Sequence, residues 1–272
     1  MTWSELCEAL DARHLLQSSG TAEASGDSGA AVVTGIVHDS RIARPGNVFV
    51  ALKGQHADGG VFVKEAVARG AVAIVSSEPH PEHLHAAWAR VHDPRLALAT
   101  LAVAFAGNPS AEMQVVGITG TNGKTTVAHL IASIFDAAGM PSGMLGTVGY
   151  RIGSEMRAAT HTTPEAPDLQ ALLREMVDRG CGACAIEVSS HALSLRRVDG
   201  MTFAAGVFTN LTRDHLDFHG DMESYFQAKR RLFDMLPDDA PALVNADDPR
   251  AASLIERCRP EVVVLFSSIS SL

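Results

Sequence analysis

The sequence predicts an α/β protein, with a small N-terminal α/β domain followed by a P-loop-type domain built on a mainly parallel sheet. Segments rich in Val, Ile, Ala and Phe alternate with segments of helical period along most of the chain. This order is typical of a parallel sheet covered by helices. Glycine-rich turns separate several of the segments. With 272 residues, 46% of them hydrophobic, the chain has enough core for one large or two ordinary domains.

The first part of the chain is expected to form a compact α/β unit. Residues 18–31 are rich in Gly, Ser, Ala and Asp, which predicts a surface loop. After it we expect strands at 36–41, 48–52 and 71–75 and helices at 62–69 and 95–105. Gly107, Asn108 and Pro109 end the last helix. The expected domains are therefore 1–108 and 109–272.

The second part alternates strands and helices more regularly. The expected strands are 114–116, 183–188, 204–210, 242–245 and 262–266, and residues 143–150 form a glycine-rich extended piece. Helices are expected over 127–135, where Val127, Leu130, Ile131, Ile134 and Phe135 form an apolar stripe, around 169–177, and at 222–236. In parallel sheets, ligands gather beyond the carboxyl ends of the strands. Polar residues that follow strands are therefore the candidates for a site.

Composition excludes several classes of protein. The net charge of −9 argues against a face that binds nucleic acid. No apolar run approaches the ~20 residues of a membrane span, and the N-terminus lacks the pattern of a signal peptide, so we expect a cytoplasmic protein without a membrane partner. Cys181 and Cys184 form an isolated CxxC that leads into an apolar strand, and we interpret them as small core residues.

The run GITGTNGKTT at 117–126 predicts a phosphate-binding loop. It lies between an expected strand and an expected helix, which is the layout that such a loop needs. Gly120, Thr121, Asn122, Gly123 and Thr126 would offer backbone N–H groups, Lys124 a positive charge and the hydroxyl of Thr125 a ligand for Mg²⁺. The spelling departs from the usual one, since Ile118 stands five residues before Gly123.

Two polar clusters follow later strands. Glu187 lies near the end of an apolar strand, where it either faces water or coordinates Mg²⁺ beside the phosphate loop; we favour coordination. Asp214, His215, Asp217 and His219 follow the next strand and its Asn210, and they suit a second cation, although such a loop can also be a solvated turn.

Lys229 interrupts the apolar stripe of the helix at 222–236, three residues after Phe226 and four before Phe233. Such a lysine either extends to solvent or is buried, and burial lowers the pKa of its amine. A neutral amine can take up CO₂ as a carbamate, which turns the cation into a metal-binding anion. Thr162 and Thr163 suit either an oxygen-rich ligand or a helix N-cap. Arg196 and Arg197 are candidate partners for a phosphate or carboxylate.

These motifs, in this order, resemble those of the Mur ligases. The motifs are GTNGKTT, TTP at 162–164, EVSSHAL at 187–193, TNLTRDHLDFHG at 209–220 and YFQAKRRLF at 225–233. HDSR at 38–41, RPGNVFVALKGQHADGG at 44–60 and GAVAIV at 70–75 resemble the UDP-binding domain of the family. The similarity is strongest to the members that add the third amino acid to UDP-N-acetylmuramoyl-L-alanyl-D-glutamate.

The resemblance implies roles for individual residues. Lys124, Thr125 and the glycines around them would hold ATP and the first of two Mg²⁺ ions, with Glu187 as a further ligand and Asn210 in the nucleotide site. His215 and a carbamylated Lys229 would serve the second ion. The UDP part would contact His38, Ser40, Gln55, His56 and Ala57, and the muramoyl dipeptide would contact Thr162, Thr163, Ser189 and Arg197. His161 and Leu195 depart from the residues common in the family.

The implied reaction is a step of peptidoglycan precursor synthesis. The glutamyl carboxylate attacks the γ-phosphate of ATP, and an amino group, from diaminopimelate or lysine, then displaces phosphate from the acyl phosphate. Family members carry a further C-terminal domain that this sequence lacks, so we expect the chain to bind its substrates without completing a turnover. Alternatives are a folylpolyglutamate synthetase, which should lack the N-terminal domain, and a non-catalytic protein that binds UDP-sugars or nucleotides.

Overall fold

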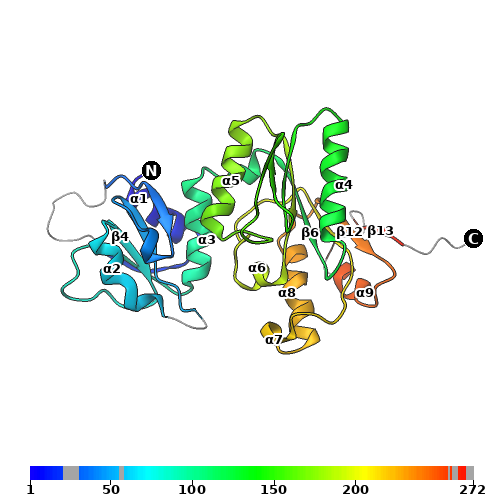
Figure 1. Ribbon diagram of the computed structural model, residues 1–272. Helices are drawn as coiled ribbons and strands as arrows, with labels where there is room; N and C mark the ends of the chain where they lie inside the picture. Colours follow the sequence, from blue (N-terminus) through cyan, green and yellow to red (C-terminus); the bar gives the residue numbers. More distant parts are fainter. Residues whose placement is uncertain (21–30, 55–57, 257, 259–262, 268–272) are drawn as a thin grey trace, which may run out of the picture. The chain divides into compact units, whose positions relative to one another are not determined.

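The structure is a computed structural model that describes residues 1–20, 31–54, 58–256, 258 and 263–267 (Figure 1). Contacts within the chain divide it into Met1–Gly107 and Asn108–Leu272, and each unit contains its own sheet and its own buried clusters. Both sheets are mostly parallel, so the α/β class predicted from the sequence is confirmed. Within the described residues, no helix is both long and apolar enough to cross a bilayer.

The sheet of the first unit has the strand order β1-β5-β4-β3-β2. Its pairs are parallel except that of β1 with β5. In chain order the elements are α1 (Trp3–Asp11), β1 (Leu16–Gly20), β2 (Gly35–Val37), η2 (Ser40–Ile42), β3 (Asn47–Val50), η3 (Gly59–Phe62), α2 (Val63–Ala68), β4 (Ala73–Ser76), β5 (Ala87–Val91) and α3 (Pro94–Phe105). Alternate strand residues enter separate clusters, Val48 and Val50 with α1 and α3, and Phe49 with α2. Helices therefore cover both faces, as an alternating pattern requires.

Two expectations for this unit are wrong in part. The expected strand at 36–41 ends at Val37, because Asp39 caps a short 3₁₀ turn by accepting a hydrogen bond from the Arg41 N–H at 2.9 Å. The expected loop at 18–31 begins too early, since residues 18–20 continue β1 and pair with β5. Residues 21–30 lie outside the described residues.

The sheet of the second unit has the order β13-β12-β11-β6-β10-β7-β8-β9, parallel from β13 to β7 and antiparallel beyond. Its elements are η4 (Pro109–Ala111), β6 (Gln114–Thr119), α4 (Lys124–Ala137), β7 (Ser142–Leu145), β8 (Tyr150–Ile152), β9 (Glu155–Arg157), α5 (Ala166–Asp178), β10 (Ala183–Glu187), α6 (Ser190–Ser194), β11 (Ala205–Phe208), α7 (Leu216–His219), α8 (Met222–Asp234), β12 (Ala242–Asn245), α9 (Ala251–Ile255) and β13 (Val263–Phe266). Figure 1 shows α4 and α5 on opposite sides of these strands. The carboxyl ends of β6, β10 and β11 are adjacent, which brings the predicted polar segments to one edge.

Helix α4 packs on the sheet through Val127, Ile131 and Phe135 of the predicted stripe, but the rest of the stripe is exposed. Its fully buried residues are Ala128 and Ala132, which lie against β6, β10 and β11, whereas Leu130 and Ile134 are 58% and 65% exposed. Small side chains let the helix backbone approach the sheet closely, so the contact face turns toward the alanines. The other half of the core holds Cys181 and Cys184 as buried free thiols, which confirms their interpretation as core residues.

Candidate functional site

The segment between β6 and α4 forms a tight glycine-dependent loop. Gly120 has a φ of 144° and Gly123 a φ of 84°, and α4 begins at Lys124. A Cβ atom added to Gly120 would lie 1.9 Å from the Thr209 hydroxyl oxygen, so this position tolerates no side chain. Thr125 and Thr126 are the second and third residues of α4, where backbone N–H groups at a helix start are free to bind an anion.

The loop is fastened to the segment that follows β11. The side-chain oxygen of Asn210 accepts a hydrogen bond from the Asn122 N–H at 3.0 Å, and its amide donates to the Asn122 carbonyl at 3.1 Å. The Thr209 hydroxyl donates to the same carbonyl at 2.6 Å. Asn210, predicted to belong to the nucleotide site, therefore holds the backbone of the loop in shape.

Two lysines meet at one carbonyl of this loop. Lys124 Nζ donates to the Gly120 carbonyl at 2.9 Å and to the Thr121 carbonyl at 2.9 Å. Lys229 Nζ donates to the Gly120 carbonyl at 2.7 Å. Since Lys229 is 1% exposed, the alternative that its amine extends to solvent is wrong. Two cationic side chains thus converge on a single oxygen.

The electrostatics of the pair follow from its burial. Desolvation, with a contribution from Lys124, lowers the pKa of Lys229 to about 7. Burial also lowers the pKa of Lys124, while the nearby carboxylates of Glu187 and Asp214 act in the opposite direction. A substantial fraction of Lys229 is therefore a neutral amine near pH 7, which is the state that reacts with CO₂.

Glu187 lies at the end of β10, and it is 1% exposed rather than facing water. Its carboxylate accepts hydrogen bonds from the Thr147 N–H at 3.0 Å and from the Thr147 hydroxyl at 3.2 Å. A Cβ atom at Gly146 would lie 2.1 Å from the Glu187 Oε1 atom, so a glycine is needed for this contact. The loop after β7 thus holds the carboxylate in place by hydrogen bonds.

His215 belongs to a group of aromatic rings whose proximity the sequence patterns did not predict. It precedes α7 with a φ of 52°, and its ring centroid lies 4.8 Å from that of His191 and 6.2 Å from that of Tyr225. The His219 ring lies 5.1 Å from Tyr225, and its Nε2 atom is 3.0 Å from the Ser190 hydroxyl. The position of Tyr225, four residues before Lys229, was the available signal that both share one helix face.

The predicted dipeptide residues form one hydrogen-bonded group. Thr163 is fully buried, and its hydroxyl donates to the Glu187 carbonyl at 2.8 Å and accepts from the Ser189 N–H at 3.1 Å. Thr162 lies next to it, with its hydroxyl 3.0 Å from that of Thr147. Arg197 donates to the Thr163 carbonyl at 2.9 Å and pairs with Glu165 at 2.6 Å. The hydroxyls therefore support the loop itself, and Ser189 caps α6.

The two positions that depart from the family pattern have structural roles. The His161 N–H donates to the Tyr150 hydroxyl at 3.1 Å, and the same hydroxyl donates to the His161 carbonyl at 2.6 Å. The backbone at this position is held independently of its side chain, which is exposed. Leu195 is the C-cap residue of α6 and directly follows Ser194, the last residue of the helix.

The donor atoms fit magnesium better than a metal that needs a protein cage. Across the described parts of the chain, no three His, Cys, Asp or Glu side chains form a cluster that could enclose an ion. Mg²⁺ commonly takes one or two carboxylates and fills its other positions with phosphate oxygens and water. Glu187 and the hydroxyl of Thr125 offer ligands of this kind beside the phosphate loop, whereas Lys229 as an amine does not.

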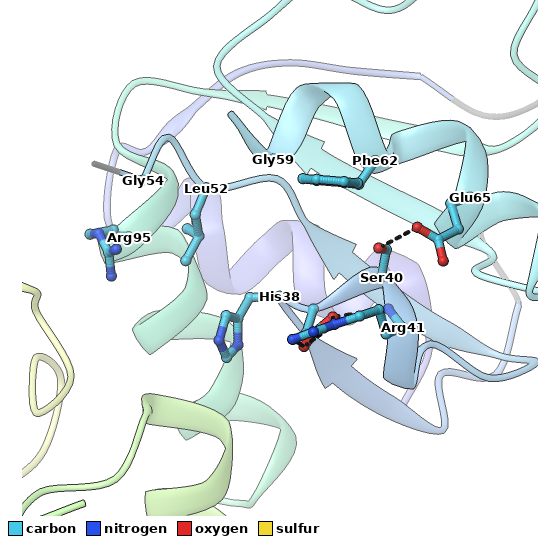
Figure 2. Close-up of a pocket in the computed structure, with 10 residues that line it drawn as sticks. His38, Ser40, Arg41, Leu52, Gly54, Gly59, Phe62, Glu65 and Arg95 are labelled. Carbon is cyan, nitrogen blue, oxygen red and sulfur yellow. Dashed lines mark hydrogen bonds and ion pairs between the residues drawn. The ribbon is translucent and has the colours of Figure 1, made fainter. Parts of the chain in front are cut away.

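The first unit contains a separate cavity of about 680 Å³ between β2, η2, η3 and α2 (Figure 2). Its lining includes the predicted residues His38 and Ser40, together with Arg41, Glu65 and Arg95, which the sequence patterns did not single out. The Ser40 hydroxyl donates to Glu65 at 2.8 Å. Gln55, His56 and Ala57 lie outside the described residues, next to Gly54 of the lining.

The cavity lining combines two arginines, Arg41 and Arg95, with two carboxylates, Asp39 and Glu65. Arg41 pairs with Asp39 at 2.6 Å and lowers the pKa of that carboxyl to about 2. His38 Nδ1 is buried without a hydrogen-bond partner among the described residues. A buried nitrogen of this kind is normally satisfied, so its orientation suits a partner supplied by a ligand.

Comparison with known proteins identifies similar chains along almost the whole sequence. Residues 118–271 match the Mur ligase middle domain, and residues 32–106 match a domain described as Mur ligase family, catalytic domain. A UDP-N-acetylmuramoyl-L-alanyl-D-glutamate–2,6-diaminopimelate ligase of Geobacter metallireducens is 49% identical over 236 residues, which are 85% of this chain and 46% of the relative. The chain thus spans about half the length of the curated relatives it matches.

Solved structures agree with the sequence matches. The structure of a UDP-N-acetylmuramoyl-L-alanyl-D-glutamate–2,6-diaminopimelate ligase has a TM-score of 0.79 and 26% identity, and covers 100% of this chain and 53% of the other. A MurF ligase from Thermotoga maritima in complex with ADP has a TM-score of 0.57 at 24% identity, over 87% of this chain and 51% of the other. The second similarity concerns the fold alone.

Proposed function

Because the chain belongs to the Mur ligase family, we propose that it binds MgATP and a UDP-muramoyl dipeptide for amide ligation in peptidoglycan precursor synthesis. The observation that carries this proposal is the group at the edge of the second sheet. There Lys124 and Lys229 donate to the Gly120 carbonyl, and Glu187 is buried beside them. A glycine loop, two amines and a carboxylate at one edge of a sheet are suited to hold a triphosphate with its cations.

The proposed reaction proceeds in two steps. The glutamyl carboxylate of the dipeptide attacks the γ-phosphorus of ATP, which forms an acyl phosphate and releases ADP. The amino group of the incoming amino acid then attacks the acyl carbon, and inorganic phosphate leaves as the amide forms. Catalysis of phosphoryl transfer depends mostly on positioning and on neutralising the negative charge that spreads over the transferred group. In this chain, Lys124 and the N-terminus of α4 would do so.

Magnesium would be held by the Thr125 hydroxyl and Glu187 together with phosphate oxygens, and it would neutralise charge on the transferred group. His215 and Lys229 would serve a second ion after Lys229 has taken up CO₂ as a carbamate. The low pKa of Lys229 supports this proposal, because the free amine and not the ammonium ion reacts with CO₂. Carbamylation also replaces an amine whose charged form is opposed by Lys124 with an anion that Lys124 attracts.

The substrate roles follow from the two separate sites. The UDP part would occupy the cavity around His38 and Ser40. Gln55, His56 and Ala57 stay candidates for the same ligand from the sequence alone. The dipeptide would lie at Thr162, Thr163, Ser189 and Arg197. The relative from Geobacter metallireducens is named as a ligase of 2,6-diaminopimelate, which favours diaminopimelate over lysine as the added amino acid. The family match over residues 32–106 favours this function over that of a folylpolyglutamate synthetase, which was expected to lack the N-terminal domain.

Titration calorimetry with matched variants tests the proposal. The chain should bind both ADP–Mg²⁺ and UDP-muramoyl dipeptide. Lys124→Ala should weaken ADP–Mg²⁺ binding by roughly 10- to 100-fold, as expected for loss of a charged hydrogen-bond donor, and leave dipeptide binding unchanged. Arg197→Ala should weaken binding of the UDP-muramoyl dipeptide and leave the affinity for ADP–Mg²⁺ unchanged. Unchanged ADP affinity in Lys124→Ala would show that the glycine loop is not the phosphate site.

A further inference from the structure

Tyr225 is a buried side chain that contacts both halves of the candidate site. It is 1% exposed and lies on α8, four residues before Lys229. Residues four apart on a helix are neighbours on one face. Tyr225 therefore extends from the helix that carries Lys229 toward the loop that follows β6.

The polar end of Tyr225 contacts the phosphate loop. Its hydroxyl oxygen lies 3.2 Å from the hydroxyl of Thr121. Thr121 is itself tied to the segment after β11, because its hydroxyl accepts from the Thr212 N–H at 3.0 Å and its N–H donates to the Asn210 carbonyl at 2.8 Å. A hydrogen bond from Tyr225 thus reaches a loop residue that is already fixed on its other side.

The aromatic face of Tyr225 contacts the amine. Lys229 Nζ lies 4.4 Å from the ring centroid, so the amine packs directly against the face of the ring. The rings of His215 and His219 pack on the same tyrosine, with centroids at 6.2 Å and 5.1 Å. One side chain therefore limits where the amine can move and also holds the rings that surround it.

We propose that Tyr225 is a positioning residue that fixes the phosphate loop and Lys229 relative to each other, with its hydroxyl acting on the loop and its ring acting on the amine. This inference rests on the proposed function, because it concerns the placement of the groups that would hold nucleotide and metal. A tyrosine needed only for packing would be replaced by phenylalanine without an effect on ligands, since the two rings have the same shape.

The hydroxyl half of the proposal is tested with Tyr225→Phe and calorimetric titration of ADP–Mg²⁺. Loss of a neutral hydrogen bond corresponds to a weakening of roughly 2- to 10-fold. The same substitution in a Thr121→Val background should change ADP affinity much less, because the partner hydroxyl is already absent. This non-additivity is a readout that a general loss of stability does not produce.

The ring half is tested at Lys229 by NMR with ¹³CO₂. Tyr225→Phe keeps the ring and should keep the carbamate signal of the wild-type chain. Tyr225→Leu removes the aromatic face, lets water reach the amine and should lower the signal by more than about half. Circular dichroism and the melting temperature of each variant show whether it is folded.

Tyr150→Phe is the matched control, since it deletes the hydroxyl of another buried tyrosine whose contacts are with His161. It should leave ADP affinity and the carbamate signal at their wild-type values. Wild-type affinity in Tyr225→Phe, or additive effects of Tyr225→Phe and Thr121→Val, would overturn the inference while leaving the proposed function intact. Failure of the wild-type chain to bind ADP–Mg²⁺ would overturn both.

Discussion

A single missing methyl group decides how the Glu187 carboxylate is held. Gly146 lies beside the carboxylate, and a Cβ atom there would come within 2.1 Å of Oε1. The two hydrogen bonds from Thr147 require this close approach. The backbone of the loop after β7 therefore fixes the direction in which the carboxylate points, in addition to the strand that carries it.

Gly146→Ala should displace Glu187 without touching the phosphate loop. Because φ at Gly146 lies outside the left-handed region, the clash and not backbone strain is the cause, and overpacking of this kind costs about 1–3 kcal/mol of stability. We expect ADP affinity in Mg²⁺ to fall toward the value measured in EDTA, with the EDTA value unchanged. Titrations in both buffers measure this difference.

Gly153→Ala is a suitable control, since a Cβ atom at Gly153 would meet nothing within 4 Å. Because φ at Gly153 is 58°, an alanine there costs some stability in its own right. Gly153 lies in the turn between β8 and β9 and does not contact the Glu187 carboxylate. If Gly146→Ala retained the full effect of Mg²⁺ on ADP affinity, Glu187 would not be a magnesium ligand.

Sequence patterns identified individual candidate side chains of the site better than the groups that these side chains contact. The position of Lys229 in an apolar stripe predicted a choice between burial and exposure, but its acceptor, the Gly120 carbonyl, lies 109 residues away in the chain. Tyr225 and His191 lie inside motifs of the sequence but were assigned no role there, and Thr147 lies in none of the motifs. Their roles arise from tertiary contacts, for which local spacing gives no signal.

Two short helices, α6 and α7, bring imidazole rings together beside Tyr225 of α8. His191 comes from α6, and its ring packs on the rings of His215, which directly precedes α7, and His219, which ends it. The rings of His215 and His219 also pack on Tyr225 of α8. Desolvation lowers the pKa of His219 to about 4, and His191, Lys229 and His215 add to the effect while Asp217 opposes it. Packing of these elements therefore favours the neutral imidazole of His219.

The stability of the chain should consequently fall with pH below about 6.5. The unfolded chain takes up a proton at His219 near its ordinary pKa of 6.5, while the folded chain resists protonation until about pH 4. The stabilisation is complete above pH 6.5 and is lost as the pH falls through this window. In His219→Gln, urea unfolding between pH 7 and 4 should show about one proton fewer taken up on unfolding. An identical pH profile for both proteins would exclude this role.

Sequence analysis missed α1 and the interior strand β5 of the first unit, and several short elements of the second unit. Strands β8 and β9 have three residues each, and α6 and α7 have five and four. Such lengths do not complete the periods on which pattern recognition depends. In α4 the period was correct and the face was right only in part, because Ala128 and Ala132, at the centre of the contact, contribute little hydrophobicity and yet allow the closest packing.

For the whole molecule, alternation of strands and helices was sufficient to predict an α/β unit in the first part of the chain and a mainly parallel sheet in the second. The antiparallel edges, β1 in the first unit and the β8–β9 hairpin in the second, lie outside that alternation. The central strands carry the candidate site, so the part of the fold that the pattern predicts best is also the part that presents Lys124 and Glu187.

The division of the chain predicts that the second unit binds nucleotide by itself. The phosphate loop, Glu187, His215 and Lys229 all belong to residues 108–272, which contain their own sheet and core. A fragment of these residues should therefore bind ADP–Mg²⁺ within roughly two-fold of the affinity of the 272-residue chain, as expected for sites that share no partners. Calorimetry on both proteins, with Lys124→Ala in each as the control, provides the comparison. A folded fragment that bound ADP–Mg²⁺ far more weakly would mean that residues 1–107 contribute to the nucleotide site.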